Sequence, residues 1–376
     1  MKIVFLIRSL NQGGAQRQLI NLAGELKNKG HAVTVCVFYS GGVLEKELLK
    51  TGVTYHSLEK SNRWDILKFM LSLNKFIRKQ KPDVLHAYLG AANILSVLLK
   101  PFQSNMHVIW GVRASNMDFS QYDWVWRSIY FFERKLSRFA DLIIVNSRAG
   151  LRFSRDNGFP EEKMTVISNG IDTDEFHPKL KAGEKVRSEW GIGKNEILIG
   201  NVARLDPKKD QVSFLKAAAR VIEKKPSIKF VSIGRGENEY QEKLIKLCNE
   251  LRISENIIWA GVRKDMPRVY NALDIMCLSS SFGEGFPNVI GEAMACGVPC
   301  VATDVGDTAR IIGNAFGIIV ETDNYEELAA GIVKMISDIK KKKHSEWSDE
   351  ARQQIKKNFS INQMVQLTER ALLDLL

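Results

Sequence analysis

The chain has 376 residues, 45% of them hydrophobic, which is enough for two domains with full cores. No apolar run approaches the roughly 20 residues that cross a bilayer, and the N-terminal run is too short for a signal peptide. The five cysteines lack metal-ligand spacing, so we expect reduced thiols and a cytoplasmic protein.

The net charge of +11 is concentrated in the first half of the chain. Residues 1–182 contain 26 Lys and Arg against 16 Asp and Glu, a net +10, whereas residues 183–376 carry +1. This asymmetry predicts an anionic partner for the first half: a membrane, a phospholipid-like substrate or nucleic acid.

Apolar strand-like runs alternate with amphipathic helical stretches along the whole chain. In the first half we expect strands at 2–7, 32–38, 84–87, 107–110, 142–146 and 164–167, and helices at 15–28, 64–78, 124–139 and 149–157. In the second half we expect strands at 197–202, 229–233, 257–259, 275–278, 300–303 and 317–320. The helices expected there are 211–223, 239–251, 266–272, 289–295, 325–337 and 349–358.

This alternation predicts an α/β protein with two doubly wound, Rossmann-like domains. We place the first domain at residues 1–172, a linker at 173–182 and the second domain at 183–358. An amphipathic helix at 359–376 ends the chain.

The segment 282–299, FGEGFPNVIGEAMACGVP, carries the strongest functional signal. It follows an expected strand and places Glu284 and Glu292 around a turn from which a helix begins after Pro287. The first turn of a helix binds anions, and Gly285 lets a ligand approach the backbone. The pattern suits a ligand with phosphates and hydroxyls, although acids that merely complement a helix dipole would look similar.

The run EGFPNVIGE, followed by AMACGVPCVATDVG, resembles the Glu-x7-Glu signature of retaining glycosyltransferases of family 4. This resemblance implies the GT-B fold, in which two Rossmann-like domains face each other across a cleft and a C-terminal helix crosses back to the first domain. It also implies transfer of a hexose-type sugar from a nucleotide-diphosphate sugar, either a UDP-sugar or a GDP-sugar.

The run NVARLDPKKDQ is similar to the donor-phosphate element of that family. On this correspondence Arg204 and Lys209 bind the leaving diphosphate, with Lys208 the neighbour that could be confused with Lys209. Glu284 then contacts the transferred sugar, and Glu292 takes the ribose hydroxyls. The other donor-binding residues implied by the resemblance are Gly13, Gly14, Gly234, Arg263, Gly285, Phe286, Pro287, Asn288 and Val289.

One departure concerns a histidine that the family usually places in the first domain. The corresponding region reads HVIWGVRASNMD, whose one histidine begins the expected strand. We therefore consider Arg113 and Asn116 as substitutes on the sugar or acceptor side. His86, which we expect at the carboxyl end of a strand, is a further candidate.

The pair Asp172 and Asp174 looks like the metal-binding DxD of another glycosyltransferase fold, but it lies in the expected linker without further acids. We therefore predict no metal and no cofactor.

Two amphipathic stretches, 64–81 and 122–139, combine cations with aromatic residues, which is typical of helices on anionic membranes. Each could equally have a core-facing apolar side and solvated cations.

The leading interpretation is a metal-independent, retaining glycosyltransferase of bacterial capsule, exopolysaccharide or O-antigen assembly. Its expected partners are a nucleotide-sugar, a lipid-linked glycan and an anionic surface at the inner face of the membrane. The alternative is a family member with a soluble acceptor, such as a polyol, a sugar phosphate or a glucan. A third interpretation, a non-enzymatic protein that binds an anionic polymer, lacks any recognisable nucleic-acid-binding module.

Overall fold

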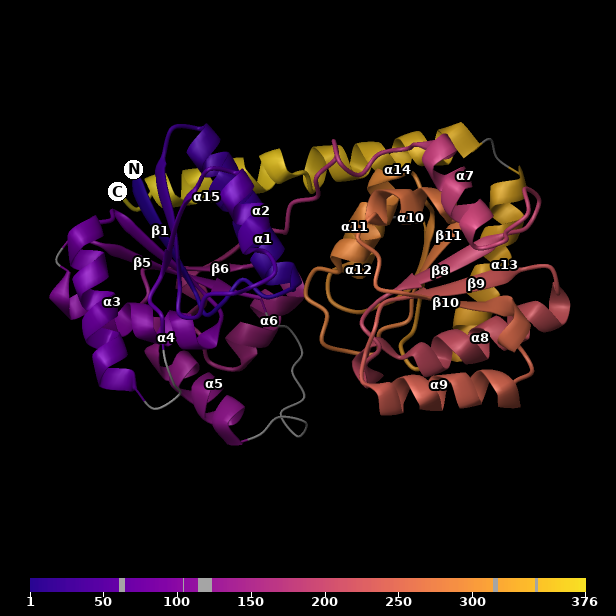
Figure 1. The fold of residues 1–376 in the computed structure, drawn as a ribbon, viewed down its shortest axis with the longest axis horizontal. Helices are drawn as coiled ribbons and strands as arrows, with labels where there is room; N and C mark the ends of the chain where they lie inside the picture. Colours follow the sequence, from indigo (N-terminus) through magenta and orange to yellow (C-terminus); the bar gives the residue numbers. More distant parts are fainter. Residues whose placement is uncertain (61–64, 104, 114–123, 314–316, 342–343) are drawn as a thin grey trace. The chain divides into compact units, whose positions relative to one another are not determined.

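The computed structural model describes residues 1–60, 65–103, 105–113, 124–313, 317–341 and 344–376. The chain forms two compact units: unit 1 contains residues 1–170 and 361–376, and unit 2 contains residues 171–360 (Figure 1). Each unit is a parallel sheet covered by helices on both faces, which agrees with the predicted fold class.

The sheet of unit 1 has seven strands in the order β3-β2-β1-β4-β5-β6-β7, all parallel. The strands are β1 (Lys2–Ile7), β2 (Ala32–Val37), β3 (Thr54–Ser57), β4 (Val84–Tyr88), β5 (His107–Val112), β6 (Leu142–Val145) and β7 (Met164–Val166). Strand order reverses between β1 and β4, the arrangement of a doubly wound fold.

Alternating residues of the strands divide the core of unit 1 into two layers. Ile3 and Phe5 of β1 face α1 (Gly14–Asn28), α2 (Glu45–Lys50) and α15 (Ile361–Leu373). Val4 and Leu6 face the opposite layer, with α3 (Ile66–Gln80) and α4 (Gly90–Leu99). The remaining helices of unit 1 are α5 (Trp124–Leu136) and α6 (Arg148–Asp156), with 3-10 turns at Lys100–Phe102, Ser137–Phe139 and Glu161–Lys163.

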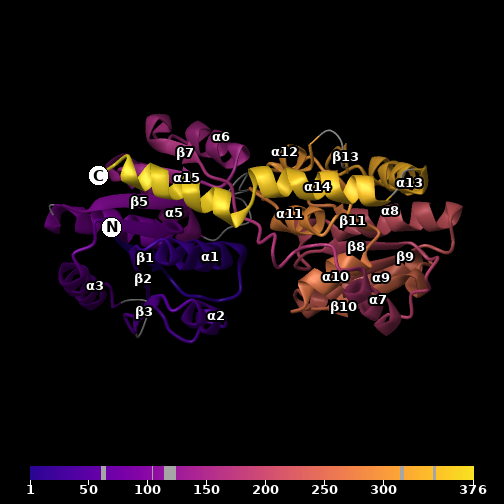
Figure 2. The same cartoon turned by 90° about the horizontal axis from the view of Figure 1, so that it is seen from above.

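Helix α15 belongs to unit 1 although it ends the chain (Figure 2). Its buried Val365 and Leu372 enter the same core layer as α1. Glu369 of α15 pairs with Lys29 at 2.6 Å and with His31 at 2.7 Å. The predicted return of the C-terminal helix to the first domain is therefore observed.

The sheet of unit 2 has six parallel strands in the order β10-β9-β8-β11-β12-β13. They are β8 (Leu198–Val202), β9 (Lys229–Ile233), β10 (Ile257–Gly261), β11 (Ile275–Leu278), β12 (Cys300–Thr303) and β13 (Gly317–Val320). The helices are α7 (Leu180–Glu189), α8 (Gln211–Lys224), α9 (Asn238–Glu250), α10 (Met266–Ala272), α11 (Asn288–Ala295), α12 (Thr308–Ile312), α13 (Tyr325–Lys341) and α14 (His344–Asn358). Two 3-10 turns lie at Pro207–Lys209 and Ser254–Asn256.

One strand, β3, and four helices, α2, α4, α7 and α12, were not predicted from the sequence. Most of these elements are short, and α4 is a nearly continuous apolar run without helical periodicity.

The prediction of a linker at 173–182 was wrong, because this segment is part of unit 2. Phe176 is buried in its core, and the guanidinium of Arg352 donates to the carbonyl oxygens of Thr173 and Phe176 at 2.7 and 2.9 Å. The last residues of the segment begin α7.

If α15 completes the core of unit 1, truncating its buried face should destabilise the protein. We expect Leu372→Ala to remove about 2–5 kcal/mol of stability, because Leu372 is completely buried. The melting temperature of unit 1 should then fall by about 5–15 °C in thermal unfolding followed by circular dichroism. Leu367→Ala, on the exposed side of α15, is the matched control. Equal melting temperatures for both variants would contradict this role of α15.

Candidate functional site

The strongest candidate site lies at the carboxyl ends of β8 and β11 in unit 2. These neighbouring strands are where the strand order of the sheet reverses, with Gly200 opposite Met276. In open α/β sheets ligands bind outside such a switch point. The loop after β8 carries Arg204 and Lys209, and the loop after β11 carries Glu284. The fold thus unites the two motifs predicted to bind the donor.

Lys209 and Glu284 form an ion pair between the two loops, with 2.5 Å between Nζ and Oε1. The side chains are 25% and 12% exposed, so a ligand can still reach them. The hydroxyl of Ser280 donates to the same Oε1 at 2.9 Å, and the hydroxyl of Ser279 donates to the carbonyl oxygen of Lys209 at 2.8 Å. One cation and one carboxylate are therefore held together by two serines.

The structure distinguishes Lys209 from its neighbour Lys208. The ammonium of Lys208 lies over the ring of Phe282, 5.9 Å from its centroid, while Lys209 contacts Glu284. Arg204 is exposed and pairs with Asp206 at 2.5 Å. The guanidinium of Arg204 therefore lies at the surface of the loop after β8, where it can reorient toward an anion.

Helix α11 begins at Asn288, directly after the Gly285–Pro287 turn. Phe286 anchors this turn, because it is buried and its ring lies 5.4 Å from that of Phe359. The predicted donor contacts at Asn288 and Val289 therefore fall in the first turn of a helix, where backbone N–H groups favour anions.

Glu292 lies in the second turn of α11 and is half-buried. The hydroxyl of the buried Tyr270 donates to its Oε2 at 2.7 Å. Burial and the carboxylate of Glu292 raise the pKa of Tyr270 well above its ordinary value, so Tyr270 remains a donor.

Two glycines allow the loops of the site to pack closely. Gly234, after β9, has φ +144°, and a Cβ there would lie 1.9 Å from the carbonyl oxygen of Ala203 in the loop after β8. Gly306 has φ +60°, and its Cβ would meet the carbonyl oxygens of Glu284 and Gly285 at 2.6 and 2.5 Å. The role of Gly234 in this structure is to let two loops meet.

Arg263 forms ion pairs that could not be predicted from the residues around it in the sequence. Its guanidinium pairs with Asp265 at 2.9 Å and also with Glu189 of α7. It lies over the ring of Trp190, 5.7 Å from the centroid. The donor contact of Arg263 stays a prediction, and such a contact would have to compete with both acids.

In unit 1, Gly14 opens α1, and Gly13 precedes it with an extended backbone at φ −179°. Arg113, just after β5, donates from Nη1 to Asn169 and from Nη2 to the hydroxyl of Tyr88, both at 2.9 Å. Asn116 lies outside the described residues.

The prediction that His86 lies at the carboxyl end of a strand was wrong. His86 is in the middle of β4, which pairs with β1 on one side and β5 on the other, and it is completely buried. Its ring centroid lies 4.7 Å from that of Tyr88, and neither ring nitrogen has a hydrogen-bond partner among the described residues. Burial, aided by Arg113, lowers its pKa to about 3, so His86 is neutral in the fold.

Within the described residues, no group of three or more His, Cys, Asp or Glu side chains is placed to hold a metal ion. Asp172 instead forms a local turn, in which its carboxylate accepts from the N–H groups of Asp174 and Glu175 at 3.0 and 2.8 Å.

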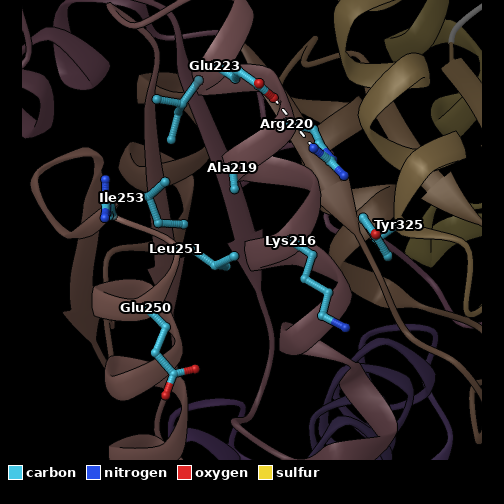
Figure 3. Close-up of a pocket in the computed structure, with 10 residues that line it drawn as sticks. Lys216, Ala219, Arg220, Glu223, Glu250, Leu251, Ile253 and Tyr325 are labelled. Carbon is cyan, nitrogen blue, oxygen red and sulfur yellow. Dashed lines mark ion pairs between the residues drawn. The ribbon is translucent and has the colours of Figure 1, made fainter.

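A surface hollow of about 520 Å³ lies elsewhere in unit 2, along α8 and the end of α9 (Figure 3). Lys216, Arg220 and Tyr325 line it, and Arg220 pairs with Glu223 across one helical turn. It contains none of the residues predicted to bind the donor, and its mixed charges select no particular ligand.

Sequence reasoning missed Ser279, Ser280 and Tyr270. The serines follow β11 in a run of three, a pattern common in loops. Tyr270 sits in a short helix, and nothing in its neighbourhood in the sequence shows that it meets Glu292.

Two family models match the chain, one for each unit. Residues 12–175 match "Glycosyltransferase Family 4", and residues 183–354 match "Glycosyl transferases group 1".

Among similar proteins is the UDP-Gal:alpha-D-GlcNAc-diphosphoundecaprenol alpha-1,3-galactosyltransferase of Escherichia coli, 25% identical over 72% of this chain and 71% of the relative. A D-inositol 3-phosphate glycosyltransferase of Corynebacterium jeikeium is 31% identical over 55% of this chain and 51% of the relative. The crystal structure of Anabaena Alr3699/HepE with UDP-glucose is similar over the full length of both chains, with a TM-score of 0.87 and 23% identity.

The buried His86 should make the protein sensitive to acid. Its pKa in the fold is about 3, against about 6.5 in the unfolded chain. The unfolded chain therefore binds more protons between these values, so stability is full above pH 6.5 and falls as the pH drops toward 3. At pH 5 the loss from this residue should be about 2 kcal/mol.

We expect His86→Leu to reduce the fall in melting temperature between pH 7 and pH 5 by about 4–8 °C. Thermal unfolding of both proteins at the two pH values measures this difference. An unchanged pH dependence in the variant would show that His86 is not the group that titrates.

Proposed function

The chain is a family-4-like glycosyltransferase with the GT-B fold, and on this premise we propose that it is a retaining hexosyltransferase that needs no metal. It takes a UDP-sugar or GDP-sugar and passes the sugar to a lipid-linked glycan in bacterial polysaccharide assembly. The observation that carries the proposal is the Lys209–Glu284 pair at the switch point of unit 2.

Departure of the nucleoside diphosphate is the step that these residues assist. Negative charge grows on the β-phosphate as the bond to the sugar breaks. Lys209 and Arg204 supply positive charge on the loop after β8, and Lys209 pairs with Glu284 shortly before α11 begins. Such fixed charges stabilise a developing anion most where water is partly excluded. A divalent metal is not needed for this role.

The two acids recognise the rest of the donor. Carboxylates accept hydrogen bonds from sugar hydroxyls, and Glu284 is adjacent to the cation that meets the phosphate. Glu292 lies further along α11, where it suits the ribose. The donor is then held along one line from the ribose through the phosphates to the transferred sugar.

A lipid-linked acceptor is supported by the relative from Escherichia coli, whose name specifies a diphosphoundecaprenol acceptor. The charge of unit 1 supports it independently, since most of the excess positive charge lies in that half of the sequence. No helix among the described residues is long and apolar enough to span a bilayer. We therefore propose that the protein binds the inner face of the membrane peripherally.

The surface of unit 1 suited to this contact is formed by α3, α4 with the following 3-10 turn, and α5. Gln103 donates to Asn74 of α3 at 3.0 Å, and Asn93 of α4 donates to Glu133 of α5 at 2.7 Å, so the three helices are neighbours. Its exposed apolar side chains are Ile66, Leu67, Leu71, Leu98, Phe102, Trp124, Trp126, Phe131 and Phe132. Its exposed cations include Lys68, Lys75, Arg78, Lys79, Arg127 and Lys135.

Both types of residue favour an anionic bilayer. Aromatic side chains partition to the membrane interface, while lysine and arginine attract lipid headgroups. Glu133, which is on the same helix as the exposed aromatics, is buried and adds no exposed negative charge. Burial raises the pKa of Glu133 to about 7.

A soluble acceptor is the second candidate. It is favoured by the relative from Corynebacterium jeikeium, which is named as a D-inositol 3-phosphate glycosyltransferase. A small anionic acceptor could also use the cations of unit 1.

Removing either cation of the site should slow transfer without unfolding the protein. We expect Lys209→Ala and Arg204→Ala to lower kcat by roughly 30- to 1,000-fold, because each loses about 2–4 kcal/mol of transition-state stabilisation. The measurement is release of nucleoside diphosphate from the donor sugar with saturating acceptor.

Lys208→Ala is the matched control, since Lys208 is adjacent in sequence but lies over Phe282. A chelator should leave the rate of the wild type unchanged. Near-wild-type turnover in Lys209→Ala, or a strict need for Mg²⁺ or Mn²⁺, would contradict the proposed mechanism.

Membrane binding should depend on the exposed lysines at the end of α3. Replacing Lys75, Lys79 and Lys81 with Glu should release the protein from vesicles rich in anionic lipid, since each cation contributes up to about 1 kcal/mol near such a surface. Flotation with vesicles, at about 0.1 M and about 1 M salt, measures the effect; the higher salt should also weaken binding by the wild type.

The same charge change in unit 2 provides the control. Lys243, Lys246 and Lys334 are exposed on α9 and α13, and their replacement with Glu should leave flotation unchanged. If the wild type fails to float at low salt, the soluble-acceptor function becomes the better one.

A further inference from the structure

Each acid of the proposed donor site accepts a hydrogen bond from a buried hydroxyl, one in the loop after β11 and the other in α10. Ser280 donates to Glu284 at 2.9 Å, and Tyr270 donates to Glu292 at 2.7 Å. We propose that Ser280 and Tyr270 are positioning residues which aim the two carboxylates at different parts of the donor: Ser280 acts on the transferred sugar through Glu284, and Tyr270 acts on the ribose through Glu292. This inference rests on the proposed function.

Ser280 is fixed from two sides. It is completely buried just after β11, and its carbonyl oxygen accepts from the hydroxyl of Thr303 of β12 at 2.7 Å. Its own hydroxyl donates to Oε1 of Glu284. A buried hydroxyl in a single, bonded position gives the carboxylate a defined orientation before any ligand arrives.

This orientation matters because Lys209 would contact two anionic groups, the carboxylate of Glu284 and the diphosphate of the donor. In the structure its ammonium contacts the same Oε1 that accepts from Ser280. When a diphosphate approaches, it competes with Glu284 for that ammonium. The bond from Ser280 keeps Glu284 in place while Lys209 turns toward the phosphate, so the sugar contact is retained.

Tyr270 plays the corresponding part at the other end of the site. It is buried in α10, with its ring edge-on to Phe176 at 5.9 Å between centroids. Because the ring is packed in this way, its hydroxyl is held facing α11, where it donates to Oε2 of Glu292. A half-buried carboxylate that loses a donor of this kind reorients toward water or takes up a proton.

The two hydroxyls act on different carboxylates, so their removal should have separable effects. Without the Ser280 hydroxyl, the nucleotide still binds but the sugar is less well placed, which lowers kcat. Without the Tyr270 hydroxyl, the ribose contact weakens in ground state and transition state alike, which raises KM and leaves kcat unchanged. A purely structural role would lower melting temperature and change both constants together.

The test compares Ser280→Ala with Tyr270→Phe, each of which removes one oxygen atom. We expect Ser280→Ala to lower kcat about 10-fold with the Kd for UDP, or for GDP if the wild type prefers it, within about twofold. We expect Tyr270→Phe to raise that Kd about 10-fold with kcat at saturating donor within about threefold. Titration calorimetry and steady-state kinetics give these values.

Two further variants separate positioning from packing. Ser280→Thr keeps the hydroxyl and should recover most of the kcat lost in Ser280→Ala. Ser232→Ala removes a buried hydroxyl of β9 that has no hydrogen-bond partner in the part of the chain that the structure describes, and it should change neither constant.

Equal changes in Kd and kcat for the two variants, or no change in either, would overturn the inference while the proposed function stood. A wild type that binds neither nucleotide and transfers no sugar would overturn the proposed function, and this inference with it.

Discussion

The parallel pairing of β8 with β11 is the constraint on which the site depends. These strands are separated in sequence by β9 and β10, yet Gly200 lies opposite Met276. A side chain at Gly200 would collide with Leu273, 2.5 Å from its Cβ position, and Asn201 ties β8 to the carbonyl oxygen of Cys277 at 3.1 Å. This packing brings the loops with Lys209 and Glu284 into contact.

The two units differ in net charge and in the side chains that they expose. Unit 2 is close to neutral in sequence, and its candidate site consists of one ion pair, one exposed arginine and one helix start. Unit 1 carries the positive charge, and α5 presents four of its exposed aromatic side chains, Trp124, Trp126, Phe131 and Phe132. The proposed function, with a soluble nucleotide-sugar and an acceptor in a membrane, would use two such different surfaces on one chain.

Most of the fold could be predicted because long strands and helices have strong periodicity. The two motifs that carry Lys209 and Glu284, which the fold brings into contact, could be recognised because they include flanking residues. His86 was misplaced because the apolar run of β4 continues into α4 and hides where the strand ends. Ser280 and Tyr270 could not be found at all. Their roles depend on which buried atoms meet after folding, and a serine or tyrosine looks the same in sequence wherever its hydroxyl points.

The most direct measurement is a crystal structure of the chain with bound UDP-sugar, or GDP-sugar if that is the preferred donor. The account predicts the diphosphate within about 3.2 Å of Nζ of Lys209 and at the first turn of α11. It also predicts the ribose at Glu292 and the transferred sugar at Glu284. A donor bound away from the β8 and β11 loops, or a diphosphate that leaves the Lys209–Glu284 pair untouched, would contradict it.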